Sequence, residues 1–395
     1  MTLALNQVTT IFLAVALLVL GTVIVKKVGL LQKFCIPAPV VGGLLFAILA
    51  TALKSVGLVE FTLDTSLQSL FMITFFTTVG LGASFQLIKL GGKLLVIYWL
   101  ACGFLALAQN VIGVSLASLF GIHPLIGMMA GAVSMEGGHG AATAFGQTLE
   151  DMGIHSALSI GIAAATFGLI AGGLVGGPTV KYLLSKYDLK PTETAEETKN
   201  VEENVPPITT NSFFIQVLLI TFCMALGTYL GELFTSATGF VLPGYVGAMF
   251  VAVIVRNIMD KLKPNAIDMK SINLISDVTL GIFLSMALMS IKLWEVADLA
   301  LPILVIVFIQ VVFIVLFGIF ILFRLLGKNY DAAVMVAGFT GHGLGATPNA
   351  MANMSAVTER FGPSRKAYLV VPIVGAFLID LFAMPIIITT INLLK

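Results

Sequence analysis

Charged residues are scarce in this sequence. Only 10% of its 395 residues are Asp, Glu, Lys or Arg, whereas a soluble globular protein carries about 25%. Hydrophobic residues make up 58% of the chain, and its mean hydropathy is +1.05. Most of these side chains cannot face water, which argues against a soluble enzyme and predicts a polytopic membrane protein in a lipid bilayer.

Cysteine is rarer still, with three residues. Cys35, Cys102 and Cys223 all fall in apolar runs, and three such residues do not form a disulfide framework. The first apolar run has no basic residue before it and two lysines, Lys26 and Lys27, after it. This is the reverse of a secretory signal, so the run is expected to remain as a helix with its N-terminus outside.

Signatures of catalysis are also missing. The sequence holds no GxSxG, HExxH, paired zinc-ligand or phosphate-loop pattern, so we expect neither an enzyme nor a nucleotide-driven pump, and no nucleic-acid partner. No Lys or Arg lies in the middle of an apolar run. An anion inside the membrane would therefore be held by backbone N–H groups, helix ends and a co-bound cation.

Apolar runs long enough to cross a hydrocarbon core of about 30 Å recur along the chain. The polar stretch 181–211 cannot bury enough apolar surface to fold alone, so we expect it to be a linker. Ten full spans are predicted, at about 8–25, 35–53, 67–88, 94–120, 156–178, 213–230, 240–255, 273–291, 300–323 and 367–391.

Two further segments, at about 124–150 and 331–359, begin apolar and continue into runs rich in Gly, Ala, Thr and Asn. If both are re-entrant hairpins, all of the 21 basic residues lie on the cytoplasmic side except Lys54, Lys292 and Lys395. If the first were a span, the basic linker would lie outside. We therefore expect a multi-pass protein of the cell (inner) membrane with both termini outside and a cytoplasmic linker.

The two halves of the chain, 1–180 and 212–395, resemble each other weakly but in the same order. IPAPVVGGLLFAIL at Ile36–Leu49 resembles LPGYVGAMFVAVIV at Leu242–Val255, and His139-Gly140 corresponds to His342-Gly343. Each half has an odd number of spans, so the second half is inverted. The predicted fold is an all-α polytopic membrane protein of two inverted five-helix repeats, each with a re-entrant Gly-rich hairpin.

The Gly-rich segments are the candidate site. Non-helical backbone survives at membrane depth only where it is buried in protein or lines a wet cavity. The tips would expose bare N–H and C=O groups, and a helix that starts after a tip directs its positive end at an anion. Carbonyl oxygens and the side chains of Thr143, Thr347, Asn349 and Asn353 suit a hard cation such as sodium. Gly can instead serve close helix packing, but two patches at matching positions favour a transport site.

Isolated ionisable or polar residues inside the membrane are functional candidates by default. Glu136, beside the first Gly cluster, could bind a cation or a proton, or could be a protonated structural residue. Asp380 in the last span could be a coupling-ion ligand or a structural hydrogen-bonding residue. Gln109 and Asn110 in the fourth span are expected to bond to a neighbouring helix rather than to line a path.

The motifs resemble those of the bacterial sodium/glutamate symporter family over nearly the whole chain. The resemblance is carried by IPAPVVGGLL, GGHG, ATFGLIAGGLVGGP, KLWEVADLALP, GKNYDAAV, GHGLGATPNAMANM, VTERFGPS and VVPIVGAFLID. It implies import of L-glutamate with co-transported sodium, an elevator-type alternating-access movement of a substrate domain against a fixed scaffold, and a homodimer.

The resemblance also implies where the site lies. Two departures from the family pattern are Glu136, where a small residue often precedes GGHG, and GHG in the second motif, where other members can carry an aromatic residue. The expected substrate-binding residues are Gly137, Gly138, His139, Gly140, Thr143, Gly343, Gly345, Thr347 and Asn349, and the expected sodium ligands are Glu136, Thr347, Asn353 and Asp380.

Two alternatives remain open at this stage. A sodium-coupled carrier of another dicarboxylate or of a hydroxycarboxylate fits the same residues, because they do not reveal the substrate's carbon number. A channel or membrane sensor would need a continuous pore or an appended signalling domain, and the sequence indicates neither.

Overall fold

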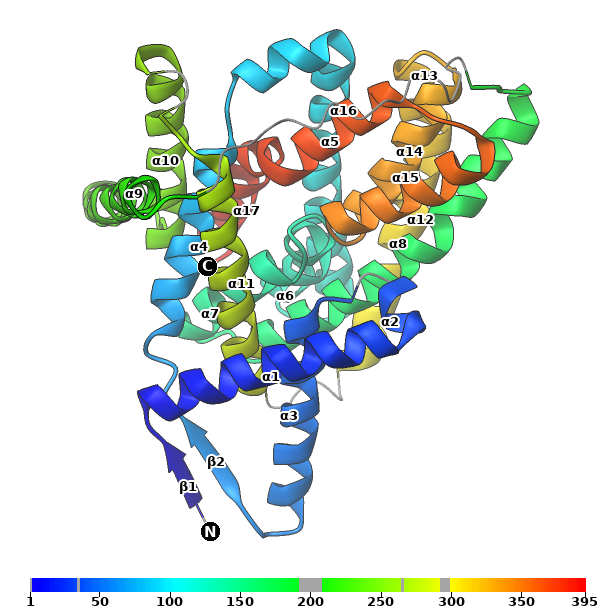
Figure 1. The fold of residues 1–395 in the computed structure, drawn as a ribbon. Helices are drawn as coiled ribbons and strands as arrows, with labels where there is room; N and C mark the ends of the chain where they lie inside the picture. The colour runs from blue at the N-terminus through cyan, green and yellow to red at the C-terminus, as the bar shows by residue number, and fades with distance from the viewer. Residues whose placement is uncertain (1, 34–35, 192–207, 264–265, 292–298) are drawn as a thin grey trace. The chain divides into compact units, whose positions relative to one another are not determined.

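The computed structural model describes residues 2–33, 36–191, 208–263, 266–291 and 299–395. Cys35, Lys292 and most of the predicted linker lie outside these ranges. The described chain is almost entirely helical, and it divides into two compact units, each assembled from segments of both sequence halves (Figure 1). Unit 1 comprises 1–84, 139–160 and 209–301, and unit 2 comprises 85–138, 161–208 and 302–395.

Unit 1 holds the first helices of each half. Its strands are β1 (Thr2–Leu5) and β2 (Glu60–Leu63), which pair in parallel. Its helices are α1 (Gln7–Lys27), α2 (Gly29–Lys33), α3 (Ala38–Ser55), α4 (Gln68–Gly82), most of α7 (Gly138–Asp151), α9 (Thr210–Thr238), α10 (Gly244–Leu262) and α11 (Met269–Met289).

Unit 2 holds the remaining helices of each half. They are α5 (Gln86–Leu119), α6 (Pro124–Met128), the π-helical turn η1 (Met129–Val133), most of α8 (Ala157–Tyr187), most of α12 (Ala300–Phe317), η5 (Gly318–Leu322), α13 (Phe323–Leu325), α14 (Tyr330–His342), α15 (Thr347–Phe361), α16 (Arg365–Ile373), η6 (Val374–Leu378) and α17 (Asp380–Leu394).

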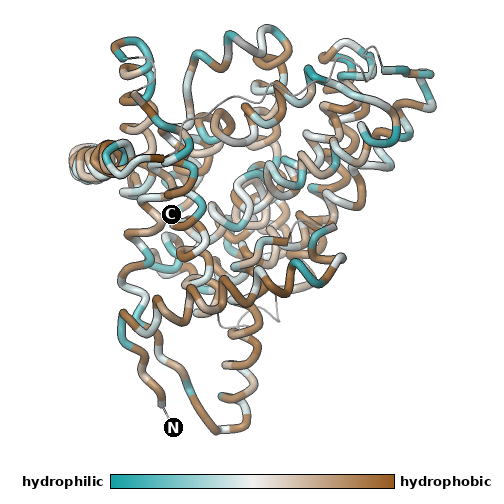
Figure 2. The backbone as a smooth tube through the Cα atoms, in the orientation of Figure 1, coloured by the Kyte–Doolittle hydropathy of each residue, from teal (hydrophilic) through white to brown (hydrophobic). Residues whose placement is uncertain are grey.

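The ends of α1 illustrate how the sequence defines these helices. Asn6 accepts a hydrogen bond from the Thr9 amide at 3.0 Å and caps the N-terminus. Lys26 and Lys27 occupy the last turn, where positive charge complements the helix dipole. Figure 2 shows hydrophobic residues along α1 and hydrophilic residues at its C-terminal end. The predicted first span is therefore a capped helix of apolar residues.

Close packing in unit 1 repeats between the two sequence halves. Pro37 precedes α3 and Pro243 precedes α10, with nearly the same backbone angles. A Cβ on Gly21 would lie 3.0 Å from the Gly42 nitrogen, and a Cβ on Gly227 would lie 2.6 Å from the Ala248 nitrogen. The number of residues from Gly21 to Gly227 equals that from Gly42 to Ala248 and that from Pro37 to Pro243. The same helix pair is thus built twice, as the weak sequence match predicted.

Each of the repeated helix pairs also packs against a helix of the other sequence half. Gly43 of α3 packs against Leu288 of α11, in the second half, whereas Gly80 of α4, in the first half, packs against Met249 of α10. Each half therefore buries its second long helix against the third long helix of the other half. This exchange explains why unit 1 cannot be cut into two contiguous sequence domains.

The described residues differ from the predicted fold in three ways. The β1–β2 pair is absent from the all-α prediction, because four-residue strands leave little periodicity in a sequence. Seven helices are long and apolar enough to span a membrane, rather than ten. The segment predicted as one span at 367–391 is a series, α16–η6–α17, which contains Pro372 and Pro385.

The other three predicted spans are shorter, more polar or interrupted, each for its own reason. The helix predicted at 67–88 ends at Gly82 and has 15 residues. The span predicted at 240–255 is α10, which continues through Arg256 and Asp260 to Leu262. The third is the interrupted C-terminal series. All three remain apolar over most of their length, and all three lie in the compact units.

Candidate functional site

The second Gly-rich segment is a closed helical hairpin in unit 2. A Cβ on Gly341 of α14 would lie 2.7 Å from Ala350 Cα of α15, and one on Gly338 would lie 2.8 Å from Met354 Sδ. As the chain advances along α14, its partner falls back along α15, so the two helices run antiparallel. The predicted segment 331–359 thus turns back on itself at Gly343–Ala346.

The base of this hairpin is fastened by polar contacts. The Tyr330 hydroxyl donates to the Gly362 carbonyl. Asp331, which is buried, accepts a 2.7 Å hydrogen bond from Ser364 Oγ and pairs with Lys366 Nζ at 3.4 Å. Asn329 caps α14 by accepting from the Ala332 amide. These contacts therefore join the beginning of α14 to the residues that follow α15.

The tips of the two Gly-rich segments touch each other. Gly138 has φ +57°, a left-handed conformation that favours glycine, and a Cβ there would lie 2.7 Å from the Gly345 carbonyl oxygen. Both residues belong to unit 2. Gly-rich segments from the two sequence halves therefore lie against each other at this pair of residues.

The helix that follows the second tip directs its N-terminus toward it. Ala346 precedes α15 and offers no side-chain cap, and Pro348 stands in the first turn. Pro348 has no N–H and the Asn349 amide donates to the Ala346 carbonyl, so the Thr347 N–H and the positive dipole end of α15 are what the helix start offers to an anion. Thr347 and His342 both lie against Gly375 of η6, since a Cβ there would be 2.9 Å from Thr347 Oγ1 and 3.0 Å from His342 Nδ1.

The two asparagines of α15 brace the hairpin against α8. Asn349 Nδ2 donates to the Leu169 carbonyl at 3.2 Å. Asn353 Nδ2 donates to the Gly172 carbonyl at 3.0 Å and to the Ala337 carbonyl at 3.4 Å. The amide nitrogens are thus engaged in helix packing, while Asn349 Oδ1 is buried with no hydrogen-bond donor among the described residues.

Gln109 bonds to the second tip, and Gln310 bonds to Gln109. Gln109 Nε2 of α5 donates to the Gly343 carbonyl at 2.7 Å, and Gln310 Nε2 of α12 donates to the Gln109 carbonyl at 2.8 Å. Asn110 Nδ2 donates to Thr390 Oγ1 of α17 at 2.7 Å. The expected interhelical bonds of Gln109 and Asn110 are confirmed. Gln310 was not predicted, although it carries the same signal of a lone polar residue in an apolar run.

Glu136 lies in a cluster of buried polar side chains in unit 2. It is 4% exposed, and neither carboxylate oxygen has a hydrogen-bond partner among the described residues. Asp380, Tyr98 and Cys102 lie within electrostatic range of it. An ionised carboxylate buried in this way is costly unless it is compensated, so the group needs a proton or a cation. Of the four predicted sodium ligands, the structure thus brings Glu136 and Asp380 near each other.

Unpaired buried polar atoms concentrate in unit 2. Such atoms are rare in folded proteins and are costly without a partner. Sequence reasoning missed Tyr98, because a tyrosine in an apolar run gives no distinguishing signal. Among the described residues of unit 2, the unpaired atoms are Tyr98 Oη, Gln109 Oε1, Asn110 Oδ1, Glu136 Oε1 and Oε2, Gln310 Oε1, His342 Nδ1 and Nε2, and Asn349 Oδ1.

The remaining predicted residues belong to unit 1. His139 is 4% exposed, and Thr143 Oγ1 is buried without a partner among the described residues. A Cβ on Gly140 would be in ordinary contact with Phe75 of α4 and Leu280 of α11. The boundary between the units falls between Gly138 and His139, so the GGHG motif contributes residues to each.

Comparison with known proteins identifies the family. The sequence profile described as sodium/glutamate symporter matches residues 3–363. The chain is 42% identical over 379 residues to a sodium/glutamate symporter of Haemophilus influenzae, covering 94% of each chain. It is 41% identical over 383 residues to the sodium/glutamate symporter of Escherichia coli, covering 95% of each.

Among solved structures, the chain aligns with a sodium/proton antiporter from Methanocaldococcus jannaschii over 99% of its own length and 98% of that chain. The sequence identity is 14% and the TM-score is 0.46, a likeness too low to bear on function. The family is one of transporters and not of enzymes, as the missing catalytic motifs predicted. On the matched length and the identity to its relatives, the chain belongs to the sodium/glutamate symporter family.

Proposed function

We propose that this protein imports L-glutamate together with sodium. The observation that carries the proposal is the contact of the Gly138 and Gly345 tips beside buried, unpaired polar groups, in a chain whose relatives are named sodium/glutamate symporters. A polar ligand that met these groups would satisfy hydrogen-bonding capacity that is otherwise lost on burial.

We propose that the anionic ends of the substrate bind at the tips. The N–H groups of Gly138 and of Thr347, at the N-terminus of α15, would supply donors, while Gly137, Gly343 and Gly345, whose N–H groups donate to the Ala132, Phe339 and His342 carbonyls, would line the site through their backbone. Asn349 of unit 2 is a further proposed substrate-binding residue, and His139, Gly140 and Thr143 of unit 1 remain candidates on the sequence motif alone. This arrangement suits a carboxylate in a membrane region that holds no mid-span Lys or Arg.

Sodium would be held by oxygen atoms. Glu136 and Asp380 supply carboxylates, and Thr347 supplies a hydroxyl, which are ligands of the type that hard cations prefer. The Tyr98 hydroxyl is a further candidate because it is unpaired and lies within electrostatic range of Glu136. Asn353 would ligate through its Oδ1, since its Nδ2 donates to the Gly172 and Ala337 carbonyls.

The proposed topology has ten spans in two inverted repeats, two re-entrant hairpins, outside termini and a cytoplasmic linker. Several contacts support it because they join chain ends that this topology puts on one side. β1 pairs with β2, both outside. Ser212 Oγ contacts Asp268 at 3.2 Å, and Tyr187 packs on Phe323 with ring centroids 5.1 Å apart, all inside.

We propose further that unit 1 is the scaffold and unit 2 the moving substrate domain of an elevator mechanism. The supporting observation is that each half contributes its first three long helices to unit 1 and later helices to unit 2. A division that repeats in both halves allows one unit to move as a body. We also propose that the protein forms a homodimer.

Uptake of labelled L-glutamate into proteoliposomes tests the proposal. A sodium gradient is expected to drive accumulation, whereas an equal potassium gradient is not. Unlabelled citrate and malate in excess should leave uptake unchanged if glutamate is the substrate. Inhibition by either would favour the alternative carrier of other dicarboxylates or hydroxycarboxylates, and gradient-independent flux would favour a channel.

A further inference from the structure

The last helical series of unit 2 loses its regular hydrogen bonding just before Asp380. η6 is a π-helical turn, a form that occurs mostly as single turns and frequently at functional sites. The Ile379 amide donates to the Val374 carbonyl, and the Phe382 amide donates to the Ile379 carbonyl at 2.9 Å. In a regular α-helix the Phe382 amide would instead bond to the Leu378 carbonyl. The Leu378 carbonyl therefore needs a donor from outside the series.

Trp99 of α5 supplies that donor. Its indole Nε1 donates to the Leu378 carbonyl at 2.7 Å. A carbonyl without a donor inside the protein is costly, so this bond ties the π-helical turn to α5. The same indole packs on the Phe382 ring, with ring centroids 4.8 Å apart. A Cβ on Gly103, about one turn further along α5, would lie 2.8 Å from Phe382 Cδ2, so the two helices approach closely here.

The two contacts of Trp99 fall on either side of Asp380 in the sequence. Residues four apart, such as Leu378 and Phe382, lie on one face of a helix. Holding both against α5 fixes the rotation and the height of the start of α17, and with them the direction in which Asp380 projects. Asp380 in turn lies within electrostatic range of Glu136.

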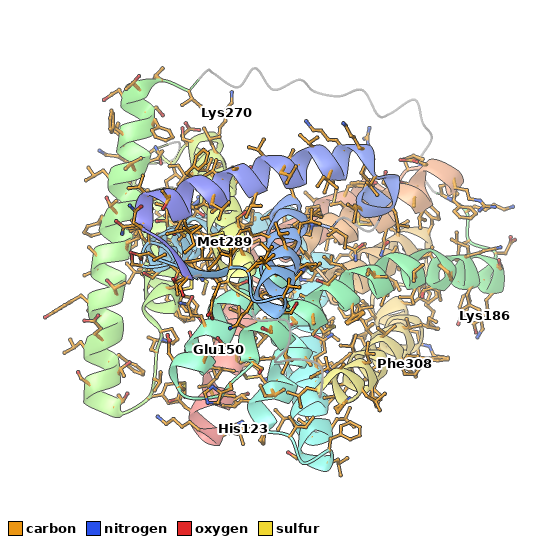
Figure 3. The ribbon with its side chains drawn as sticks, turned by 90° about the horizontal axis from the view of Figure 1, so that it is seen from below. His123, Glu150, Lys186, Lys270, Met289 and Phe308 are labelled. Atoms are coloured by element: carbon orange, nitrogen blue, oxygen red, sulfur yellow. The ribbon has the colours of Figure 1, made fainter. Side chains whose placement is uncertain are left out.

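α17 is attached to α5 at a second level. Asn110 Nδ2 donates to Thr390 Oγ1 at 2.7 Å, further along both helices, so α5 and α17 run in the same direction. Figure 3 shows α17, in red, near the labelled His123, which follows the end of α5. Of these two attachments, the one at Trp99 is next in sequence to a carboxylate.

We propose that Trp99 is a positioning residue for sodium, because its indole, bonded to Leu378 and packed on Phe382, sets the place of Asp380 relative to Glu136. The inference rests on the proposed role of these two carboxylates as sodium ligands. Trp99 does not touch the ion. Residues that hold metal ligands in place affect metal affinity without being ligands themselves, so a change at Trp99 weakens sodium binding while both carboxylates remain.

The sodium dependence of glutamate uptake in proteoliposomes tests this role. Trp99→Phe keeps an aromatic ring against Phe382 and removes the N–H donor. We expect the sodium concentration for half-maximal uptake to rise about fivefold, the factor that corresponds to the loss of one hydrogen bond. The maximal rate and the glutamate concentration for half-maximal uptake, both measured at saturating sodium, should stay unchanged.

Phe104→Leu is the matched control. Phe104 lies on the same helix, is 50% exposed and stacks on Phe317 of α12 with ring centroids 5.3 Å apart. Its replacement removes a ring contact of α5 that does not involve α17. The sodium dependence of uptake should therefore equal that of the unchanged protein.

Sodium binding is also measured without transport. The midpoint of thermal unfolding in potassium reports the fold, and its increase in sodium reports binding, because a ligand of the folded state stabilises that state. Trp99→Phe should lose part of the increase, and so should Phe382→Leu, which removes the second contact beside Asp380. In an Asp380→Asn protein, Trp99→Phe should cause no further loss, because its effect passes through Asp380.

Two results would overturn the proposal. One is a sodium curve of Trp99→Phe that equals that of the unchanged protein. The other is an equal further loss in the Asp380→Asn protein, which would show that Trp99 acts elsewhere. Failure of the proposed function looks different, since uptake by the unchanged protein would then not depend on sodium. The thermal measurement would still compare sodium binding between the variants, and absence of any stabilisation specific to sodium would overturn both proposals.

Discussion

Glycine is required at position 138 for two reasons, the backbone conformation and the lack of space for a side chain. Its left-handed backbone disfavours any side chain, and its contact with the Gly345 carbonyl leaves no room for one. We predict that Gly138→Ala lowers the stability of the protein by at least about 1–2 kcal/mol from the backbone conformation alone. It should also abolish sodium-driven glutamate uptake, because the two tips would be forced apart.

Gly29→Ala is the matched control for this substitution. Gly29 begins α2, has no atom within 4 Å of a built Cβ and does not have the left-handed backbone. Thermal unfolding and proteoliposome uptake should be unchanged by it. Normal uptake by Gly138→Ala would show that the tip contact is not needed for transport.

Glu136 is the second residue whose environment demands an explanation. Because its buried carboxylate lacks donors and lies near Asp380, replacing it by Gln removes charge without removing volume. We predict that Glu136→Gln raises the sodium concentration for half-maximal uptake roughly tenfold, which corresponds to about 1.4 kcal/mol of lost cation binding.

The control for Glu136→Gln is Glu60→Gln. Glu60 is a half-exposed carboxylate that pairs with Lys54 at 2.7 Å in unit 1. Its loss should not alter the sodium dependence. If Glu136→Gln and Glu60→Gln give the same sodium curve as the unchanged protein, Glu136 is a protonated structural residue.

Residue by residue, the sequence predicted polar and ionisable positions better than it predicted their partners. Glu136, Asp380 and Gln109 stood out because they interrupt apolar runs. Tyr98 did not, and nothing local could indicate that Asn353 donates to α8, since that bond joins residues 181 apart in the chain. A side chain's partner depends on which helices pack together, which a single sequence does not state.

At the scale of elements, the hairpin of α14 and α15 depends on its fastened base. Removing Asp331 would leave Ser364 and Lys366 without their acceptor, so that the Tyr330–Gly362 hydrogen bond alone would join the two ends there. We predict that Asp331→Ala weakens local stability by about 1–3 kcal/mol. Hydrogen exchange should accelerate over residues 330–362.

Lys366→Gln separates the two contributions at this base. Lys366 is 58% exposed on its side chain, so its ion pair is solvent-screened and should be worth less than about 1 kcal/mol. Exchange in the hairpin should therefore change little. An effect of Lys366→Gln equal to that of Asp331→Ala would mean that the ion pair, and not the buried hydrogen bond, holds the base.

The stability of the N-terminus of α11 is expected to depend on pH. Asp268 precedes the helix, and hydrogen bonds from Ser271, the Lys270 amide and Ser212 lower its pKa below the usual 3.8. A lowered pKa means that the stabilisation is present above the unfolded value and is lost as pH falls through the folded value. We predict that acid unfolding of Asp268→Asn has a shallower pH dependence below about pH 4. Identical acid profiles for the two proteins would contradict this assignment.

At the scale of the whole molecule, run lengths and charge placement predicted the helices and the hairpin of α14 and α15, and the motifs indicated the family, but none of them predicted how the helices are grouped. The sequence divides naturally at the linker into two halves, whereas the fold groups the beginnings of both halves in unit 1 and their ends in unit 2. The reason is the exchange between α3–α11 and α10–α4, which links the halves through glycines whose partners are distant in sequence.

The inversion of the repeat can be tested at one pair of equivalent helices. α3 and α10 begin with the same proline cap and pack through equivalent small residues, so Lys54 and Lys261 mark matching C-terminal ends. A repeat that is inverted in the membrane puts these ends on opposite sides, whereas a repeat that is not inverted puts them on the same side.

We predict that Lys54→Cys reacts with a membrane-impermeant thiol reagent added to intact cells, and that Lys261→Cys reacts only after permeabilisation. Both variants are made in a chain with Cys35, Cys102 and Cys223 replaced by Ala, and both positions are exposed enough to react. Retained sodium-driven uptake confirms that each variant is folded. Labelling of both positions from the same side would overturn the inverted repeat and, with it, the cytoplasmic assignment of the linker, because the five-span halves would no longer have opposite orientation.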